Sequence, residues 1–462
     1  MSVAHDALAT IWSAAGGDRS ATARVEFHGD AELPSAFSVT DLASASIGAA
    51  ALAASELARN VNETPDSAPI RVDRRLASAW FLTTIDPIGW QLPPVWDAVA
   101  GDYESSDGWI RLHTNAPHHR AAALRVLGCA PDREAVARAV AKWDATELES
   151  AVVDAGGCAA EMRTIAAWEE HPHGREVASE PLIHTERFDE RDPDGEAGTI
   201  ERNPTRPLRG VRVLDLTRVL AGPVATRFLA GLGAEVLRID PPGWDEPAIV
   251  PEVTLGKRCA RLDATTSDGR RRIAELLYGA DVIVHGYRPD ALAGLAFDSD
   301  ARRELRPGLV DVSLDAYGWT GPWRMRRGFD SLVQMSCGIA AAGMEAKRAG
   351  QPFPLPVQAL DHATGYLMAT AALRGLQTRR TDSTGTTARV SLARTARLLA
   401  ALERRAFDGT SATVGADDYE PGVEHTPWGD LRRLRPPVTV PGVAISWTRG
   451  ATTLGSDEPA WM

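Results

Sequence analysis

The sequence predicts an α/β protein that combines a doubly wound parallel sheet with a smaller α+β domain. Short apolar runs rich in β-branched residues alternate with helical patterns, and these runs lie at 211–216, 235–240, 281–287 and 309–318. Strands separated by helices form parallel sheets through right-handed crossovers. A charged stretch at 186–207, poor in apolar residues, is typical of a linker between the two parts.

The elements follow in order along the chain. Residues 1–94 form a segment of helices and strands, and 95–185 form the small α+β domain, in which a hairpin pattern at 102–115 precedes three helical patterns. After the linker, 208–400 carry the Rossmann-like sheet domain. Residues 401–462 are rich in proline, which favours an extended C-terminal segment.

An internal repeat links the N-terminal segment to the sheet domain. Residues 33–82 parallel 355–399: each has Leu-Pro, an aspartate, a helix of small residues, a polar turn, Arg-Val and a second helix. Asp41 corresponds to Asp361. The shared order indicates a duplicated helix–turn–strand unit, so we expect 33–82 to pack beside the main sheet.

Composition excludes several classes of protein. The 462 residues are 44% hydrophobic and 24% charged, which is ordinary for a globular protein. The net charge is −12 and no basic stripe is present, so we expect no nucleic-acid partner. Four widely spaced cysteines argue against disulfides and structural zinc. The longest apolar run, IGAAALAA, is too short to cross a bilayer, and no signal peptide is evident. We expect a cytoplasmic protein without membrane contact.

Two stretches carry candidate chemistry. In the first, a strand, an Ala-Gly-Pro loop and a helix start could hold a nucleotide, but G-x-G-x-x-G is missing and Asp240 alone stands where a ribose-binding acid would be expected. A plain βαβ turn stays an alternative. In the second, Asp361 lies where LPVQAL runs into an apolar helix. It could be a helix cap, for which aspartate is favoured, or a nucleophile.

Five segments in series resemble the class III CoA-transferase family, which includes formyl-CoA and carnitine CoA-transferases and α-methylacyl-CoA racemase. They read VLDLTRVLAGPVATRFLAGLGAEVLRID, GKRCARLD, ADVIVHGYRPDALAGLAF, YGWTGPWRMRRGFDSLVQMSCG and LDHATGYLMATAAL. Residues 107–174 resemble the family's small domain, which here precedes the nucleotide-binding half. The resemblance therefore implies a permuted or fused arrangement, and, since members of the family are interlocked dimers, a homodimer.

The resemblance implies that Asp361 is a nucleophile. Its carboxylate would attack an acyl-CoA thioester to give a mixed anhydride, then an aspartyl-CoA thioester, and an acceptor carboxylic acid would take the CoA. We expect the helix dipole to keep Asp361 ionised. His362 should serve packing, because consecutive helical side chains diverge, and Asp41 should be a cap or a relic.

The resemblance also implies which residues hold CoA, which is a substrate here, with no tightly bound cofactor. Four basic residues match positions that contact CoA in the family: Lys257, Arg258, Arg288 and Arg327. Val219, Leu220 and Ala221 match the loop that borders the nucleotide. Arg324 and Arg326 are expected to belong to a solvated basic turn.

Two other functions stay open beside CoA transfer. Racemases of the family carry a histidine where Phe329 stands in Gly328-Phe329-Asp330, and phenylalanine cannot accept a proton, which favours the transferase. A non-catalytic acyl-CoA-binding protein is the other alternative. His113, His118 and His119 lack spaced carboxylate or thiol partners, so we interpret them as surface histidines and not as a metal site.

Overall fold

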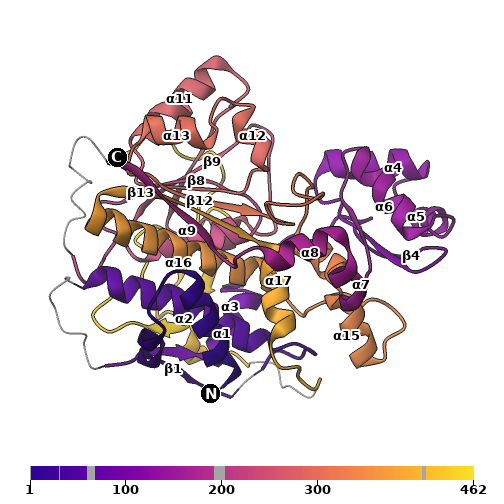
Figure 1. Cartoon of the computed structure of the whole chain (residues 1–462), viewed down its shortest axis with the longest axis horizontal. Coiled ribbons are helices and arrows are strands. Elements are labelled where there is room, and N and C mark those ends of the chain that lie inside the picture. Colours follow the sequence, from indigo (N-terminus) through magenta and orange to yellow (C-terminus); the bar gives the residue numbers. More distant parts are fainter. Residues whose placement is uncertain (1, 31, 60–67, 192–202, 408–412) are drawn as a thin grey trace.

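The computed structural model describes residues 2–30, 32–59, 68–191, 203–407 and 413–462 (Figure 1). A seven-stranded sheet forms its centre within these ranges, in the order β10-β9-β8-β11-β12-β13-β7. The strands are β8 Arg212–Leu216, β9 Glu235–Asp240, β10 Lys257–Arg261, β11 Val282–His285, β12 Val310–Asp315, β13 Thr384–Ser391 and β7 His184–Arg191. The α/β fold class is confirmed.

Six of these strands run parallel, and β7 pairs antiparallel with β13 at one edge. The chain runs from β8 outward to β10 and then returns to place β11 on the other side of β8. The strand order therefore reverses between β8 and β11. In open α/β sheets this reversal leaves a crevice at the carboxyl ends of the strands.

The strand β7 covers residues that the sequence analysis assigned to the linker. Its sequence, HTERFDER, is mostly charged, but an edge strand pairs on one side only and tolerates polar residues. The prediction of a linker is therefore wrong for 186–191. Residues 192–202 of the predicted linker lie outside the described residues.

Helices cover both faces of the sheet (Figure 1). One face carries α11 Ser267–Tyr278, α12 Pro289–Ala293 and α13 Ser299–Leu305. The other carries α9 Ala221–Gly231 and α16 Ala359–Asp382. Almost every residue in the first half of α16 is buried, because this helix lies between the sheet, α9 and the N-terminal helix α2.

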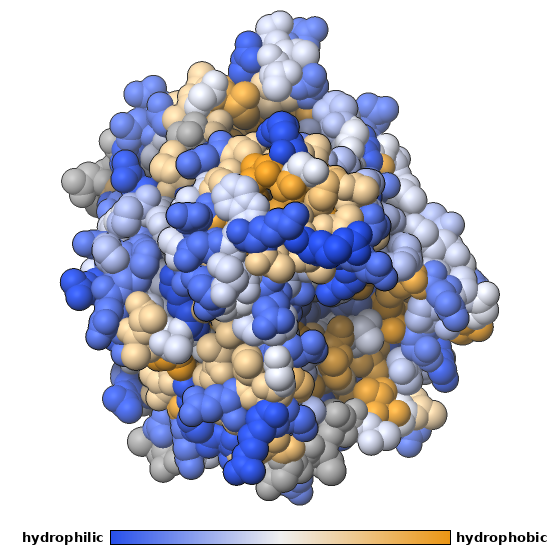
Figure 2. All heavy atoms as spheres, turned by 90° about the vertical axis from the view of Figure 1, so that its right-hand side faces the viewer, coloured by the Kyte–Doolittle hydropathy of each residue, from blue (hydrophilic) through white to orange (hydrophobic). Residues whose placement is uncertain are grey.

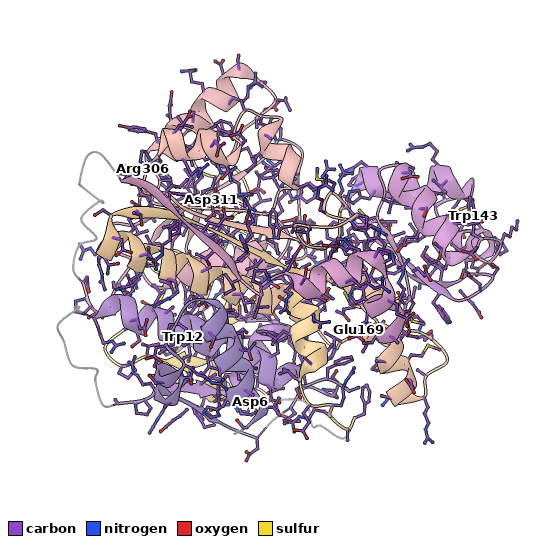
Figure 3. The ribbon with its side chains drawn as sticks, in the orientation of Figure 1. Asp6, Trp12, Trp143, Glu169, Arg306 and Asp311 are labelled. Atoms are coloured by element: carbon purple, nitrogen blue, oxygen red, sulfur yellow. The ribbon has the colours of Figure 1, made fainter. Side chains whose placement is uncertain are left out.

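The N-terminal segment forms a further layer against α16. It contains α1 Val3–Ala14, η1 Arg19–Arg24, β1 Val25–His28, α2 Val39–Ala58, β2 Ile70–Asp73 and α3 Arg74–Leu82. The helix α2 packs on α16, while β2 pairs with β1 and β16 in a separate sheet. Trp12 of α1, labelled in Figure 3, is fully buried. The guanidinium of Arg374 from α16 lies 5.2 Å from the centre of its ring.

A small α+β part lies to one side of the sheet. Its antiparallel strands are β4 Gly101–Glu104, β5 Trp109–Leu112 and β6 Ala159–Glu161, and its helices are α4 Pro117–Leu127, α5 Arg133–Val140, α6 Ala145–Asp154, α7 Ile165–Glu170 and α8 Pro172–Ser179. It has a hydrophobic cluster of its own around Ile110 and Leu148. The helix α4 begins with proline and ends at Gly128 with φ 60°, the favoured arrangement at both helix ends.

The remaining elements connect these parts. Near the small part lie α14 Asp330–Ser336, α15 Ile339–Lys347 and α17 Leu392–Ala401. The others are β3 Ile85–Pro87, α10 Val250–Val253, η2 Ala416–Asp418, β14 Glu424–Thr426, β15 Gly429–Arg433 and β16 Val438–Thr439. Beyond β16 the tail is extended, and Trp461 Nε1 donates to the carbonyl of Leu276 on α11.

Across the described ranges, no helix has the length and apolarity needed to cross a membrane. One face of the molecule shows hydrophilic and apolar atoms mixed, with apolar atoms gathered beside a hollow (Figure 2).

Candidate active site

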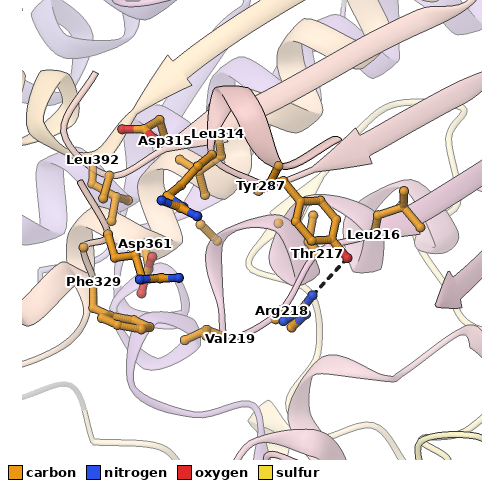
Figure 4. Close-up of a pocket in the computed structure, with 18 of the residues that line it drawn as sticks. Leu216, Thr217, Arg218, Val219, Tyr287, Leu314, Asp315, Phe329, Asp361 and Leu392 are labelled. Atoms are coloured by element: carbon orange, nitrogen blue, oxygen red, sulfur yellow. Dashed lines mark hydrogen bonds between the residues drawn. The ribbon is translucent and has the colours of Figure 1, made fainter. Parts of the chain in front are cut away.

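A cavity of about 380 Å³ opens at the carboxyl ends of β8, β11 and β12. Its walls come from separate segments: the strand ends, the start of α9, the start of α4, the loop before α14, and α16. This is the point at which the strand order reverses, where open α/β sheets bind ligands. Figure 4 shows Asp361 between Phe329 and Leu392 in this cavity.

Asp361 is the third residue of α16, and it does not cap the helix. Asp330 does so instead: its Oδ2 accepts the backbone N–H of Asp361 at 2.9 Å, while its Oδ1 accepts from Gln334. Among the described residues, the structure records no hydrogen bond to the carboxylate of Asp361. The helix-cap interpretation is therefore wrong, and both carboxylate oxygens of Asp361 can face a ligand in the cavity.

Burial, and then the charge of Asp330, raise the pKa of Asp361 well above its usual range. Burial also raises the pKa of Asp330, to about 6, although its hydrogen bonds oppose this. Burial and the neighbouring Asp330 therefore oppose the helix dipole, which was expected to keep Asp361 ionised. Removal from water raises the free energy of the ionised carboxylate by more than the dipole of one helix lowers it.

The loop before α9 holds an unusual backbone conformation. Val219 has φ 63°, a region that branched side chains rarely adopt. Its N–H donates to Glu246 Oε1 at 2.7 Å, and the other oxygen of Glu246 accepts from Arg238 at 2.9 Å. Strain of this kind persists where the surroundings enforce it and is common at functional sites.

An arginine lies between two aromatic rings at the opening of the cavity. The guanidinium of Arg218 lies 4.8 Å from the ring of Trp244 and 5.2 Å from that of Tyr287, and it donates to the Tyr287 hydroxyl at 2.9 Å. Arg288 and Arg327 also line the cavity, and among the described residues the structure records no ion pair for either. Arg326 lines the cavity as well, so four guanidinium groups lie in its walls and could meet an anionic ligand.

Comparison with known proteins decides the family of the main part. Residues 208–419 match the family model of CoA-transferase family III. This segment belongs to CoA-transferase family III. The resemblance inferred from the sequence motifs is confirmed.

The most similar proteins include known and probable CoA-transferases. A probable fatty acyl-CoA transferase of Mycobacterium tuberculosis, Rv3272, is 35% identical over 38% of this chain and 47% of its own length. The human succinyl-CoA:glutarate CoA-transferase is 33% identical over 38% and 43%. A crystal structure of Rv3272 covers 41% of this chain and 56% of its own at TM-score 0.39 and 33% identity. The chain thus spans about half the length of these relatives.

Within the family III segment, Val219 and Ala221 line the cavity, whereas Leu220 between them packs against the hydrophobic core. Val219 and Ala221 therefore lie in the same cavity as Asp361, Arg288 and Arg327.

Lys257 and Arg258 lie elsewhere, which corrects their assignment as CoA ligands. Lys257 is fully buried, and its ammonium donates to Asp215, to Thr226 and to the carbonyl of Pro223, which uses all three hydrogens. Arg258 donates to the carbonyls of Glu458 and Ala460 in the C-terminal segment. Neither side chain lines the cavity.

Asp240 is not available to a ribose. It is fully buried, and its two oxygens accept from Arg238 at 2.9 Å each. Charge pairing within the sheet thus accounts for an acid that sequence spacing placed near a nucleotide.

The basic turn before α14 is only partly solvated. Arg324 is exposed, but Arg326 forms an ion pair with Glu149 at 2.9 Å and lies 4.1 Å from the ring of Trp323. The prediction of a solvated Arg326 is wrong, because the small part folds against this turn.

The three histidines of the small part are also placed differently than expected. His118 is exposed, but His113 and His119 are buried. His113 stacks on Phe329 with ring centroids 3.7 Å apart, and His118 and His119 line the cavity. The surface interpretation is wrong for two of the three. His362, predicted to pack, is buried and stacks on Phe81 at 4.8 Å.

The repeated aspartate Asp41 has a different environment from Asp361. It is the third residue of α2 and is buried, but its oxygens accept from Arg74 at 2.5 Å and Arg405 at 2.7 Å. It caps no helix, so the cap interpretation is wrong here too. It is a charge-neutralised structural carboxylate.

Two cavity residues, Arg218 and Trp244, were missed from the sequence, and His119 was noticed but interpreted as a surface residue. Arg218 lies inside the LTRVLAG turn that was singled out, and its place beside a helix start was a usable signal. Trp244 gave no signal, since only tertiary folding brings it to the cavity.

Proposed function

We propose that the protein transfers CoA from an acyl-CoA thioester to an acceptor carboxylic acid through Asp361. One observation carries the proposal: Asp361 is an uncapped carboxylate in a cavity at the strand-order reversal of a family III segment. The named relatives are CoA-transferases, which supports the same reaction class.

The proposed reaction consists of four acyl transfers in series. An oxygen of ionised Asp361 attacks the thioester carbonyl, the C–S bond breaks, and CoA leaves as a thiolate, which gives a mixed anhydride. The thiolate attacks the aspartyl carbon, releases the first acid as its carboxylate and leaves CoA on Asp361. The acceptor carboxylate attacks this thioester, which breaks the C–S bond, releases CoA thiolate and forms a second anhydride. The thiolate then attacks the acceptor acyl carbon, which frees the Asp361 carboxylate and gives the new acyl-CoA.

The buried position of Asp361 suits a nucleophile. A carboxylate that is poorly solvated keeps more of its basicity and reacts faster than one in water. The raised pKa means that positive charge in the cavity helps Asp361 to ionise, and Arg288 and Arg327 line the same cavity. Further rate enhancement comes from holding the thioester carbon next to the carboxylate.

We assign CoA binding to the loop before α9 and to the cavity arginines. The start of α9 presents the N–H groups of Leu220 and Ala221, which favour phosphate, and Val219, whose own N–H is bound to Glu246, borders this position. Arg288 and Arg327 would each contribute about 1.5–3 kcal/mol through a charge-assisted phosphate contact. CoA enters as substrate and leaves as product; no tightly bound cofactor is required. A homodimer and a cytoplasmic location belong to the same proposal.

The experiment that tests this function is covalent trapping. The protein is incubated with acetyl-CoA, succinyl-CoA and octanoyl-CoA in turn, trapped with hydroxylamine or borohydride, and digested for mass spectrometry. We expect a mass change on the Asp361 peptide, absent in Asp361→Asn, which keeps the shape of the side chain but is not nucleophilic.

Two outcomes would contradict CoA transfer. CoA binding without any adduct on Asp361 would favour a binding protein. Exchange of the α-proton of the acyl group with heavy water, without an adduct, would favour a racemase.

A further inference from the structure

His119 is a buried histidine in the same cavity as Asp361. It lies in the first turn of α4, 4% exposed, and lines the cavity from the side of the small α+β part. Its nearest rings are those of His118, at 4.1 Å, and Phe329, at 5.9 Å. Phe329 directly precedes the aspartate that caps the helix of Asp361.

Neither ring nitrogen of His119 has a hydrogen-bond partner among the described residues. Another buried histidine of the small part, His173, is fully satisfied: Nε2 lies 2.7 Å from the carbonyl of Tyr317, and Nδ1 accepts the N–H of Trp323. An unsatisfied buried polar group costs about 1–3 kcal/mol. Beside a cavity, a bound ligand is the partner that such a side chain can reach.

His119 is uncharged near neutral pH. Burial first, and then the charges of His118 and Arg327, lower its pKa to about 4. A neutral imidazole offers one N–H donor and one acceptor nitrogen. With so low a pKa it is a weak base, so its usable property in the cavity is the N–H donor.

We propose that His119 donates its ring N–H to the carbonyl oxygen of the acyl-CoA thioester while Asp361 attacks the carbonyl carbon. This inference rests on the proposed function. As the C–O bond to Asp361 forms, the carbonyl π electrons move onto oxygen, and the hydrogen bond stabilises that negative charge. The proton stays on His119. When the oxyanion collapses, the C–S bond breaks and the CoA thiolate leaves.

An uncharged donor fits this site better than a cation. An imidazolium would pair with Asp361 and weaken it as a nucleophile, whereas a neutral N–H gains strength only as the oxygen becomes negative. Interactions that strengthen in the transition state accelerate the reaction, and one such donor is worth about 10²–10³ in rate.

The test compares His119→Leu with His119→Gln. Single-turnover formation of the Asp361 adduct is followed with whichever of acetyl-CoA, succinyl-CoA and octanoyl-CoA labels the wild-type protein. We expect His119→Leu to slow adduct formation about 10²–10³-fold, and His119→Gln, which keeps an N–H donor, to recover most of that loss. His28→Leu, an exposed histidine on β1, is the matched control and should react as wild type.

Stability and CoA affinity separate a catalytic role from a structural one. Leucine removes a buried polar ring that has no partner, so we expect the Tm of His119→Leu to stay level or rise. We also expect the calorimetric Kd for free CoA to change less than about threefold, since a donor to the thioester carbonyl adds little to free-CoA binding. A falling Tm or a lost affinity in step with the rate would make His119 structural and overturn the inference.

The two proposals fail in different ways. If the wild-type protein forms no Asp361 adduct with any of the three thioesters, the proposed function is wrong and the role of His119 is wrong with it. If the wild type forms the adduct and His119→Leu forms it equally fast, only the role of His119 is wrong.

Discussion

Asp361 and Asp41 show how one neighbour changes the chemistry of a carboxylate. Each is the third residue of its helix, and each helix follows a residue of similar backbone conformation, Gln358 and Ser38. The unit that follows also matches: α17 begins at Leu392 and α3 begins at Arg74. Arg74 pairs with Asp41, whereas Leu392 lines the cavity that holds Asp361.

Leu392→Arg should therefore greatly slow the reaction of Asp361 with acyl-CoA. The new guanidinium would stand where Arg74 stands in the other copy, pair with the carboxylate and lower its pKa, which weakens the nucleophile. We expect adduct formation on Asp361 to fall by about 100-fold or more, a few kcal/mol of transition-state stabilisation. Leu392→Met, which keeps the volume and adds no charge, is the control. Unchanged labelling in Leu392→Arg would contradict this explanation of the two aspartates.

A second prediction concerns Asp315, at the end of β12. Burial raises its pKa from 3.8 to about 8, although the N–H groups of Tyr317 and Gly318 oppose this. The folded protein thus binds a proton that the unfolded chain releases, so the contribution of Asp315 to stability is greatest below pH 3.8 and is lost as pH rises toward 8. The slope is at most about 1.4 kcal/mol per pH unit. Asp315→Asn should flatten the fall, measured by urea unfolding between pH 5 and 8; an unchanged slope would count against a neutral Asp315.

At the scale of elements, the sequence predicts strands and helices that depend on local residues, but it misses contacts that form only when distant segments pack together. The strand β10, which reads KRCAR, was missed, but β8, β9, β11 and β12 were predictable because they are short runs rich in apolar residues, as is typical of buried parallel strands. The edge strand β7 was not, since its charged sequence has no such run. The same holds for the site: family motifs pointed to Asp361 and Arg288, but the pairing of Lys257 with Asp215 depends on packing between α9 and two strands.

The loop before α9 gives a prediction at this scale. Glu246 holds the N–H of Val219 and is itself held by Arg238. Glu246→Ala should release the loop from its positive φ and weaken CoA binding about tenfold, or about 1.4 kcal/mol. Calorimetry with free CoA measures it, with Glu134→Ala on the exposed face of α5 as the control. Unchanged affinity would mean that the loop keeps its conformation without Glu246.

The whole molecule is joined by a buried charge cluster that no single segment contains. Glu252 follows the sheet strand β9 and pairs with Arg227 of α9. Its oxygens also accept from the N–H and hydroxyl of Thr84, in the N-terminal segment, at 3.0 and 2.6 Å. Arg433 of β15, near the C-terminus, donates to the same hydroxyl at 3.1 Å. Three distant stretches of the chain therefore meet at one carboxylate.

Glu252→Gln should destabilise the whole fold. Burial alone would raise the pKa of Glu252, but Arg227 and Arg433 outweigh it and lower the pKa to about 2. The carboxylate thus contributes stability that is present above about pH 4.5 and is lost as pH falls toward 2. Glutamine removes the charge and leaves the buried Arg227 uncompensated, whereas Arg433 keeps its ion pair with Glu424 at 2.6 Å; breaking one buried ion pair costs about 3–5 kcal/mol. Urea unfolding at pH 7 measures that loss, and the same titration carried down to pH 3 should show a smaller acid-induced decline in the variant than in the wild type. If the two proteins lost stability in parallel below pH 4.5, Glu252 would not be the group that links the three segments.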